Sequence, residues 1–224
     1  MNEYLIIVAG GTGTRINSDV PKQYLLLNNT PIIIHSINRF LSYNKSIRII
    51  CCVHKDYIKH AQDLMSEYFS AHKIIITEGG ETRFHSVKNG LKLIQDNNSV
   101  VAIHDAARPL VSIGTIKRCF DSARNFNSGV PVIKMNESIR ITEGEKNKSV
   151  DRNNYRIVQT PQCFSTNLLQ QAFMVAYKEI FTDDATVFEN AEHSITLVEG
   201  NSENTKITLP IDIAIAEVLL KNVE

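Results

Sequence analysis

The residues with the clearest chemistry lie near the start of the chain, in the sequence VAGGTGTR of residues 8–15. Three glycines among four residues let backbone amides approach a phosphate closely, because no Cβ atom blocks the way. Arg15 adds a planar fork of hydrogen-bond donors. Lys22, within the sequence PKQY of residues 21–24, adds a compact positive charge. The pattern predicts a phosphate-binding loop, and the alternative is a plain glycine turn between a strand and a helix.

Two common nucleotide-binding motifs are excluded by the spelling of this loop. A dinucleotide fingerprint requires GxGxxG, but Ile16 stands where the third glycine belongs, which argues against a dinucleotide-dependent reductase. A Walker loop requires a Gly-Lys pair, and the chain contains none.

Two further motifs follow predicted strands. In GGETRFHSV, residues 79–87, the glycine amides and Ser86 can hold the polar edge of a base, whereas a tight turn with Thr82 as helix N-cap is the alternative. In HDAARP, residues 104–109, Asp105 can bind Mg²⁺ or a sugar hydroxyl and Arg108 a phosphate. An ordinary Asp–Arg ion pair is the alternative there. We interpret His104 as an interior histidine with its hydrogen bonds satisfied.

The remaining candidates are scattered over the C-terminal half. Asp183 and Asp184 open a predicted helix, where their negative charge complements the helix dipole, and this explains them more simply than a metal site. Lys206 precedes another predicted helix and can meet a phosphate, with a surface lysine as the alternative.

These residues must be positioned by alternating strands and helices. Continuous apolar runs, rich in β-branched residues, predict strands at residues 4–9, 47–53, 73–77, 100–104 and 130–133. Apolar residues at helical spacing predict helices at 30–41, 56–69, 82–94 and 113–126. Such alternation predicts an α/β fold, a Rossmann-like and mostly parallel sheet flanked by helices. Ligands bind such sheets at the carboxyl ends of the strands.

The pattern changes between residues 135 and 152, which are polar and contain one short alternating piece before a Glu-Gly turn. This predicts a protruding β-hairpin arm, which is either mobile or packed on another subunit.

Beyond the arm we predict strands at 156–159 and 195–199 and helices at 165–179 and 183–191. We also predict a C-terminal helix from about residue 208, with Pro210 in its first turn and Asp212 near its positive end. Four of its residues should face inward: Ile211, Ile215, Val218 and Leu219.

Composition narrows the class of protein. The 224 residues carry 24 basic and 24 acidic side chains, and this zero net charge argues against a general nucleic-acid binder. Four cysteines without metal-ligand spacing favour buried free thiols in a reducing compartment. No apolar stretch is long enough for a membrane span and no signal peptide is recognisable, so we expect a cytoplasmic protein of one domain.

Taken together and in order, AGGTGTR, PKQY, GGETRFHSV, HDAARP, VDR, QTPQ, TDDA and NTKIT resemble the 2-C-methyl-D-erythritol 4-phosphate cytidylyltransferase family of the non-mevalonate isoprenoid pathway. The resemblance covers nearly the whole chain. It implies an enzyme of nucleotidyltransferase fold that transfers a cytidylyl group from CTP to methylerythritol phosphate with Mg²⁺, releasing pyrophosphate. It also implies a homodimer joined by the arm at about residues 135–152, within a single domain of residues 1–224.

The resemblance also implies a role for each matching residue. The catalytic residues would be Arg15, Lys22 and Lys206. The nucleotide contacts would be Ala9, Gly10, Gly11, Thr12, Gly13, Gly80, Glu81, Ser86 and Ala106. The polyol phosphate contacts would be Asp105, Arg108, Thr160 and Thr182, together with Ser138 and Arg152 from the partner subunit's arm. No firm metal ligand is implied: Asp105 is possible, and Mg²⁺ would be bound mainly through the triphosphate.

Some positions depart from the common family pattern. The first loop reads AGG where AAG is frequent, and Glu137-Ser138 stands in the arm where Asp-Thr is usual, although serine keeps the hydroxyl group. Two alternatives follow: a ribitol 5-phosphate cytidylyltransferase, which shares most of these motifs, and a catalytically silent nucleotide-binding protein. Three cations around one phosphate argue against the silent protein.

Overall fold

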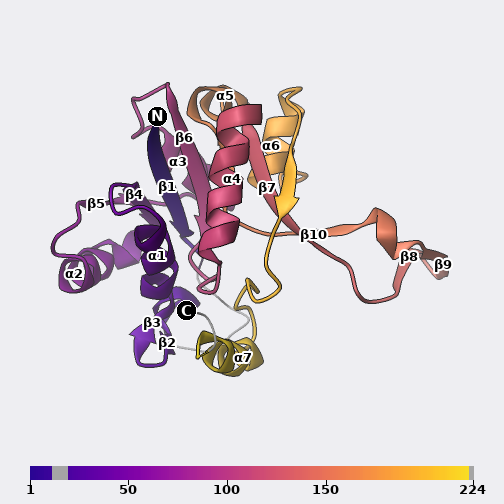
Figure 1. The fold of residues 1–224 in the computed structure, drawn as a ribbon, viewed down its shortest axis with the longest axis horizontal. Helices are drawn as coiled ribbons and strands as arrows, with labels where there is room; N and C mark the ends of the chain where they lie inside the picture. The colour runs from indigo at the N-terminus through magenta and orange to yellow at the C-terminus, as the bar shows by residue number, and fades with distance from the viewer. Residues whose placement is uncertain (12–19, 222–224) are drawn as a thin grey trace.

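Apolar runs that end at polar or glycine residues form the core strands of the computed structural model, which describes residues 1–11 and 20–221 (Figure 1). β1 (Asn2–Ala9) lies between β4 (Arg48–Val53) and β6 (Ser99–Asp105), parallel to both, and β5 (Ile74–Glu78) pairs in parallel with β4. Every residue of β6 is buried, as expected for a strand covered on both faces. The predicted strands of this half are confirmed.

Beyond β6 the sheet changes direction. β11 (Gln162–Ser165) lies between β6 and β7 (Ser128–Lys134) and is antiparallel to both. β10 (Arg156–Val158) pairs antiparallel with β7, and β12 (Leu197–Glu199) pairs with β7 in parallel. The eight-stranded sheet is therefore mixed with a parallel majority, which confirms the predicted fold class. β11 was not predicted, because four residues directly before a helix give too short a pattern.

Helices cover both faces of the sheet because the side chains of β1 alternate between them. Leu5 and Ile7 share a buried cluster with α1 (Ile32–Tyr43), α2 (Ile58–Tyr68) and α4 (Ile113–Phe126). Tyr4 and Ile6 share another with α3 (Arg83–Leu91), α5 (Thr166–Ala172) and α6 (Asp184–Asn190). The helices predicted from apolar spacing are present: α4 has the predicted bounds, α1 lies two residues later than predicted, and α2 and α3 are shorter.

α5 ends at Ala172, so the predicted helix over residues 165–179 is wrong beyond that point. The rings of Phe173 and Phe181 both stack on Phe84, with centroids at 4.8 and 5.6 Å. Residues 173–180, which join the two rings, form turns and irregular structure instead of helix. The chain therefore turns between them.

The predicted arm is a two-stranded hairpin that stands away from the body (Figure 1). β8 (Ile139–Glu143) and β9 (Lys146–Val150) pair antiparallel around Gly144, whose φ of +57° suits glycine. Nearly all side chains of the hairpin are exposed. A short 3₁₀ turn, η3 (Arg152–Asn154), leads back to β10.

α7 (Pro210–Leu220) lies below the sheet in Figure 1 and begins at the predicted Pro210, with the Asp212 carboxylate accepting from the amides of Thr208 and Leu209. The predicted inward face is largely wrong, because three of its residues are exposed: Ile211, Ile215 and Val218. Leu219 packs against a small cluster that contains Leu27, Ile32, Leu110, Ile207 and Ala216. The helix is apolar nearly all round, so its sequence does not specify which face is buried.

Short elements join these parts: η1 (Lys22–Tyr24), η2 (Lys55–Tyr57) and a hairpin of β2 (Leu26–Leu27) with β3 (Thr30–Pro31). All four cysteines are buried and unbridged, as predicted. Across the described ranges, 1–11 and 20–221, no helix is long and apolar enough to cross a membrane.

Candidate active site

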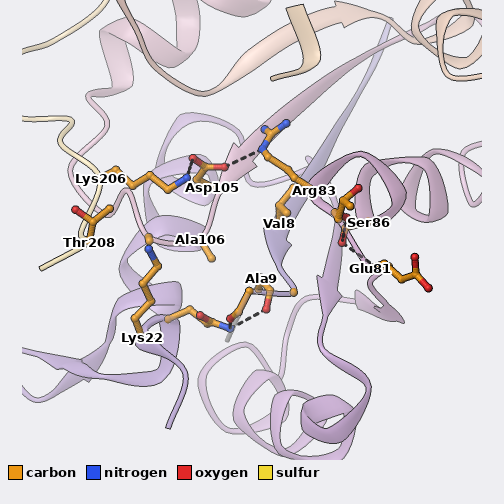
Figure 2. A pocket seen from close by; sticks show the side chains of 16 residues that line it. Val8, Ala9, Lys22, Glu81, Arg83, Ser86, Asp105, Ala106, Lys206 and Thr208 are labelled. Carbon is orange, nitrogen blue, oxygen red and sulfur yellow. Dashed lines mark hydrogen bonds and ion pairs between the residues drawn. The ribbon is translucent and has the colours of Figure 1, made fainter. Parts of the chain in front are cut away.

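A cavity of about 280 Å³ lies at the carboxyl ends of β1 and β6, where the fold predicts a ligand (Figure 2). The end of β1 forms one wall. The side-chain amide of Gln23, which is 3% exposed, donates to the carbonyl oxygens of Ala9 at 2.7 Å and Gly11 at 3.1 Å. One side chain thereby fixes the described part of the glycine loop from both sides of Gly10.

Two lysines far apart in the sequence enter this cavity together (Figure 2). The ammonium group of Lys22, on η1, donates to the carbonyl oxygen of Ile207 at 2.9 Å, next to Lys206. The Ile207 amide in turn donates to the carbonyl oxygen of Ala107 at 2.9 Å, which ties this segment to the end of β6. The chain thus brings both positive charges to the glycine loop.

A narrow turn after β5 forms the opposite wall. The hydroxyl group of Ser86 accepts from the Gly80 amide at 3.0 Å and donates to the Thr82 carbonyl at 3.1 Å. A Cβ atom at Gly79 would lie 3.0 Å from the Ser86 hydroxyl oxygen, and one at Gly80 would lie 2.2 Å from the His85 side chain. Glycine is required at position 80, and at position 79 a side chain would press against the Ser86 hydroxyl. Thr82 also caps α3, as the alternative interpretation expected.

Asp105 is the central anion of the site. Its Oδ1 accepts from Arg83 Nε at 3.2 Å, while its Oδ2 lies 2.8 Å from Lys206 Nζ and 3.5 Å from Arg108 Nε. Burial disfavours ionisation of this carboxyl, but the charges of Arg83, Lys206 and Arg108 outweigh burial and hold its pKa well below the usual range. Asp105 therefore stays negative and fixes the ammonium group of Lys206.

A buried hydrogen-bond chain supports Asp105 from behind. The Thr160 hydroxyl accepts from the Asp105 amide at 3.1 Å and lies 2.9 Å from His104 Nδ1. The Arg108 carbonyl can only accept, so His104 Nε2 carries the ring proton and donates to it at 3.0 Å, and Nδ1 of the neutral ring accepts from the Thr160 hydroxyl. Burial lowers the pKa of His104 to about 4, so its ring stays neutral. His104 is an interior histidine, as predicted.

Most of the predicted site residues within the described ranges line this cavity: Ala9, Gly10, Gly11, Lys22, Gly80, Glu81, Ser86, Asp105, Ala106 and Lys206. Thr12, Gly13 and Arg15 lie outside the described residues. The structure thus gathers segments from four parts of the sequence around one space.

Five predicted substrate contacts do not line the cavity: Arg108, Thr160, Thr182, Ser138 and Arg152. Arg108 donates to the Asn204 carbonyl at 2.8 Å and so anchors the segment before Lys206. Thr160 is 5% exposed and engaged by the chain described above, whereas Thr182 is exposed just before α6. Ser138 and Arg152 lie at the base of the arm, where Arg152 donates to the Asn136 carbonyl.

Six lining residues were not among the predicted site residues: Val8, Gln23, Thr82, Arg83, Ala107 and Thr208. Gln23 and Arg83 are the two of them whose side-chain contacts hold the site together. A signal for Arg83 was present, because a cation in the first turn of a helix opposes the helix dipole and needs a compensating anion. Gln23 carried no such signal.

Of the two acids that open α6, Asp183 is the N-cap in a capping box, as the dipole interpretation requires. Asp184 instead turns inward to Arg83 at 2.7 Å.

Asp105 does not fit the role of a metal ligand in this arrangement, because both of its oxygens already face cationic side chains. In residues 1–11 and 20–221, no group of three or more His, Cys, Asp or Glu side chains is arranged to hold a metal ion. The charged lining, with Lys22, Lys206 and Arg83 against Asp105 and Glu81, suits an anionic ligand.

Comparisons with known proteins agree with this geometry. A family model described as 2-C-methyl-D-erythritol 4-phosphate cytidylyltransferase (IspD) matches residues 4–222. The enzyme of that name from Phocaeicola vulgatus is 41% identical over 220 residues, which covers 98% of this chain and 100% of the relative. The enzyme of that name from Porphyromonas gingivalis is 42% identical over 220 residues, and the match covers 97% of each of the two chains.

Solved structures show the same fold. The crystal structure of Francisella tularensis 2-C-methyl-D-erythritol 4-phosphate cytidylyltransferase is similar with a TM-score of 0.81 at 31% identity, covering 97% of this chain and 99% of that one. The 4-diphosphocytidyl-2C-methyl-D-erythritol synthase from Anaerococcus prevotii gives a TM-score of 0.83 at 24% identity, with 98% of each chain covered. The site, the fold and these similarities lead to one conclusion: the chain belongs to the 2-C-methyl-D-erythritol 4-phosphate cytidylyltransferase family.

Proposed function

We propose that the protein transfers the cytidylyl group of CTP to 2-C-methyl-D-erythritol 4-phosphate. A phosphate oxygen of the alcohol attacks the α-phosphorus of CTP in line, and the bond to the β-phosphate oxygen breaks, so that a CDP-alcohol and pyrophosphate are formed. The observation that carries this proposal is the convergence of Lys22 and Lys206 with the glycine loop on one cavity. The family model and the relatives reported above all carry the methylerythritol phosphate name, which favours that alcohol over ribitol 5-phosphate.

The nucleotide would lie between the two glycine-containing walls. We propose that cytosine is held against Ala9 and Gly10 on one side and Gly80, Glu81 and Ser86 on the other. The Gly80 amide and the Ser86 hydroxyl already form a tight polar turn there. The triphosphate would then extend along the glycine loop towards the lysines, because backbone amides and ammonium groups are its natural partners.

The chemistry needs charge stabilisation rather than a covalent intermediate. The transferred group becomes more negative at its equatorial oxygens in the transition state, so fixed cations lower the barrier more than they stabilise the ground state. Lys22 is fixed by the Ile207 carbonyl and Lys206 by Asp105, so neither ammonium group has to reorganise when CTP binds. We propose that Arg15, outside the described residues, contributes a third cation.

We propose that Mg²⁺, which the family resemblance implies, arrives bound to the triphosphate rather than to a carboxylate cage. The support is the pairing of both Asp105 oxygens with cationic side chains. We assign no catalytic step to the metal.

The arm supports a further part of the proposal, a homodimer in which it reaches the partner's site. A hairpin with nearly all side chains exposed gains little stability alone, so a second subunit is its natural support. Ser138 and Arg152 would then contact the alcohol phosphate bound to the other chain.

We also propose one cytidylyltransferase domain over residues 1–224, because a single sheet contains strands from Asn2 to Glu199. Buried free cysteines support a cytoplasmic location.

The experiment that tests the function is pyrophosphate release with Mg²⁺ and CTP, using methylerythritol phosphate and ribitol 5-phosphate in parallel reactions. We expect release with methylerythritol phosphate alone. Release with ribitol 5-phosphate alone would change the second substrate and leave the nucleotide site intact. No release with either alcohol, although CTP binds, would leave a nucleotide-binding protein without catalysis.

A further inference from the structure

Arg83 joins two carboxylates that come from different parts of the chain. Its Nε donates to Asp105 Oδ1 at 3.2 Å, at the end of β6, and its Nη2 donates to Asp184 Oδ2 at 2.7 Å, in the first turn of α6. Arg83 lines the cavity, whereas Asp184 does not line it and is 1% exposed. The guanidinium group therefore connects the reaction cavity to a buried anion behind it.

Among the described residues, the Asp184 side chain accepts a hydrogen bond from one partner. The second carboxylate oxygen of Asp184 is buried and has no hydrogen-bond partner among the described residues, so Arg83 is the single donor to this side chain there. Burying an ion pair requires both charges to leave water, and apolar residues of similar volume often serve stability as well or better. A cation at the first position of a helix is also unfavourable by itself. Stability alone is a poor account of this arrangement.

Geometry offers a better account. Arg83 holds Oδ1 of Asp105, which leaves the Oδ2 edge turned towards Lys206 at 2.8 Å (Figure 2). Without Arg83, the Asp105 carboxylate can rotate about its terminal bond, and Lys206 loses the fixed partner that orients its ammonium group. Asp184 restrains Arg83 at a second nitrogen, because two hydrogen bonds from adjacent donors to two carboxylates define the plane of the guanidinium group.

We propose that Arg83 is a positioning residue for cytidylyl transfer: held by Asp184, it orients Asp105 so that Lys206 is presented to the α-phosphate. The inference rests on the proposed function for the role of Lys206. It assigns Asp184, a residue outside the cavity, an effect on turnover that passes through Arg83 alone.

The test compares Asp184→Asn, Arg83→Gln and the double variant in steady-state pyrophosphate release. Misplacement of a reacting group by about 1 Å can slow a reaction by about a hundredfold. We expect kcat to fall by about tenfold to a hundredfold in each single variant, with KM for CTP changed less than about threefold. The double variant should be no slower than Arg83→Gln, since Asp184 has no other route to the site.

A matched control is available at the opposite end of the sheet, where Arg124 pairs with the buried carboxylate of Glu3. Arg124→Gln removes a comparable buried ion pair far from the cavity, so it should lower the melting temperature and leave kcat unchanged. Equal thermal destabilisation of Asp184→Asn and Arg124→Gln with unchanged kcat in both would overturn the inference and leave a structural pair.

Arg83→Lys keeps the test decisive if Arg83→Gln does not fold. It retains a cation between the carboxylates, but one ammonium group cannot reproduce the two fixed, coplanar donors of the guanidinium group. A folded Arg83→Lys protein with reduced kcat supports the inference, and one with the kcat of the unmodified protein contradicts it. The unmodified protein measured alongside separates this outcome from failure of the proposed function, because in that case it too would release no pyrophosphate.

Discussion

Replacing Gln23 by alanine should weaken CTP binding without slowing the chemical step. The Gln23 side chain donates both amide hydrogens to loop carbonyls, at 2.7 and 3.1 Å, and is almost fully buried. Each such hydrogen bond contributes about 1 kcal/mol net, so losing both removes about 2 kcal/mol of restraint on the glycine loop. If CTP binds only the ordered loop, this converts to a rise of about thirtyfold in KM for CTP.

The assay measures initial rates over a range of CTP concentrations, with the second substrate saturating, and compares them with direct CTP titration by calorimetry. We expect kcat and KM for the alcohol phosphate to stay within about twofold, because the lysines keep their own contacts. Gln23→Glu should weaken binding further, since a carboxylate cannot donate to carbonyl oxygens and repels the triphosphate.

Gln170→Ala is a closely matched control. The Gln170 amide likewise bridges two backbone carbonyls, those of Leu91 at 2.9 Å and Ile94 at 2.8 Å, away from the cavity. It should cost similar stability and leave KM for CTP unchanged. A KM for CTP that rises equally in both variants, or in neither, would refute the idea that Gln23 acts by ordering the loop.

Three further outcomes follow from the structure and the sequence. Lys22→Ala and Arg15→Ala should each lower kcat by about a hundredfold to a thousandfold with the circular dichroism spectrum retained, and near-normal turnover in either would remove its transition-state role. Deleting residues 137–150 should shift sedimentation velocity towards monomer and raise KM for the alcohol phosphate more than for CTP, whereas an unchanged monomer–dimer balance would count against the arm as the dimer contact. Burial holds the pKa of His104 at about 4, while the unfolded chain takes up this proton near its ordinary value of 6.5. The free energy of unfolding should therefore decrease by up to about 3 kcal/mol as the pH is lowered from 6.5 to 4. Denaturant titrations at pH 7 and pH 4.5 should show that His104→Asn abolishes this loss. The exposed His60→Asn control should retain it.

The parts of the fold that could be predicted are those in which one local pattern dominates. β1, β4 and β6 are covered on both faces, so their sequences are continuous apolar runs that end where polar motifs begin. Because parallel strands end at one edge, the motifs after β1, β5 and β6 had to meet there, and most of the predicted site followed from that geometry.

What escaped prediction depends on contacts between distant segments. The Arg83–Asp184 pair spans 101 residues and depends on α3 and α6 both packing against α5, which neither local sequence encodes. β11 is too short to show a period. The buried face of α7 was misjudged because the helix is apolar on every side, and its exposed Ile211 and Ile215 can be assigned only from the tertiary structure.

The insertion of β11 between β6 and β7 has a consequence for how the chain is made. β6, all of whose residues end up buried, pairs on one side with β1 and on the other with residues 162–165. At typical synthesis rates the ribosome adds those residues roughly 3–10 s after β6. During that interval β6 has an unpaired edge of backbone N–H and C=O groups, which is a template for pairing with another nascent chain. Chains interrupted before Gln162 should therefore aggregate rather than accumulate as a folded half, and chaperone binding should be strongest in this window.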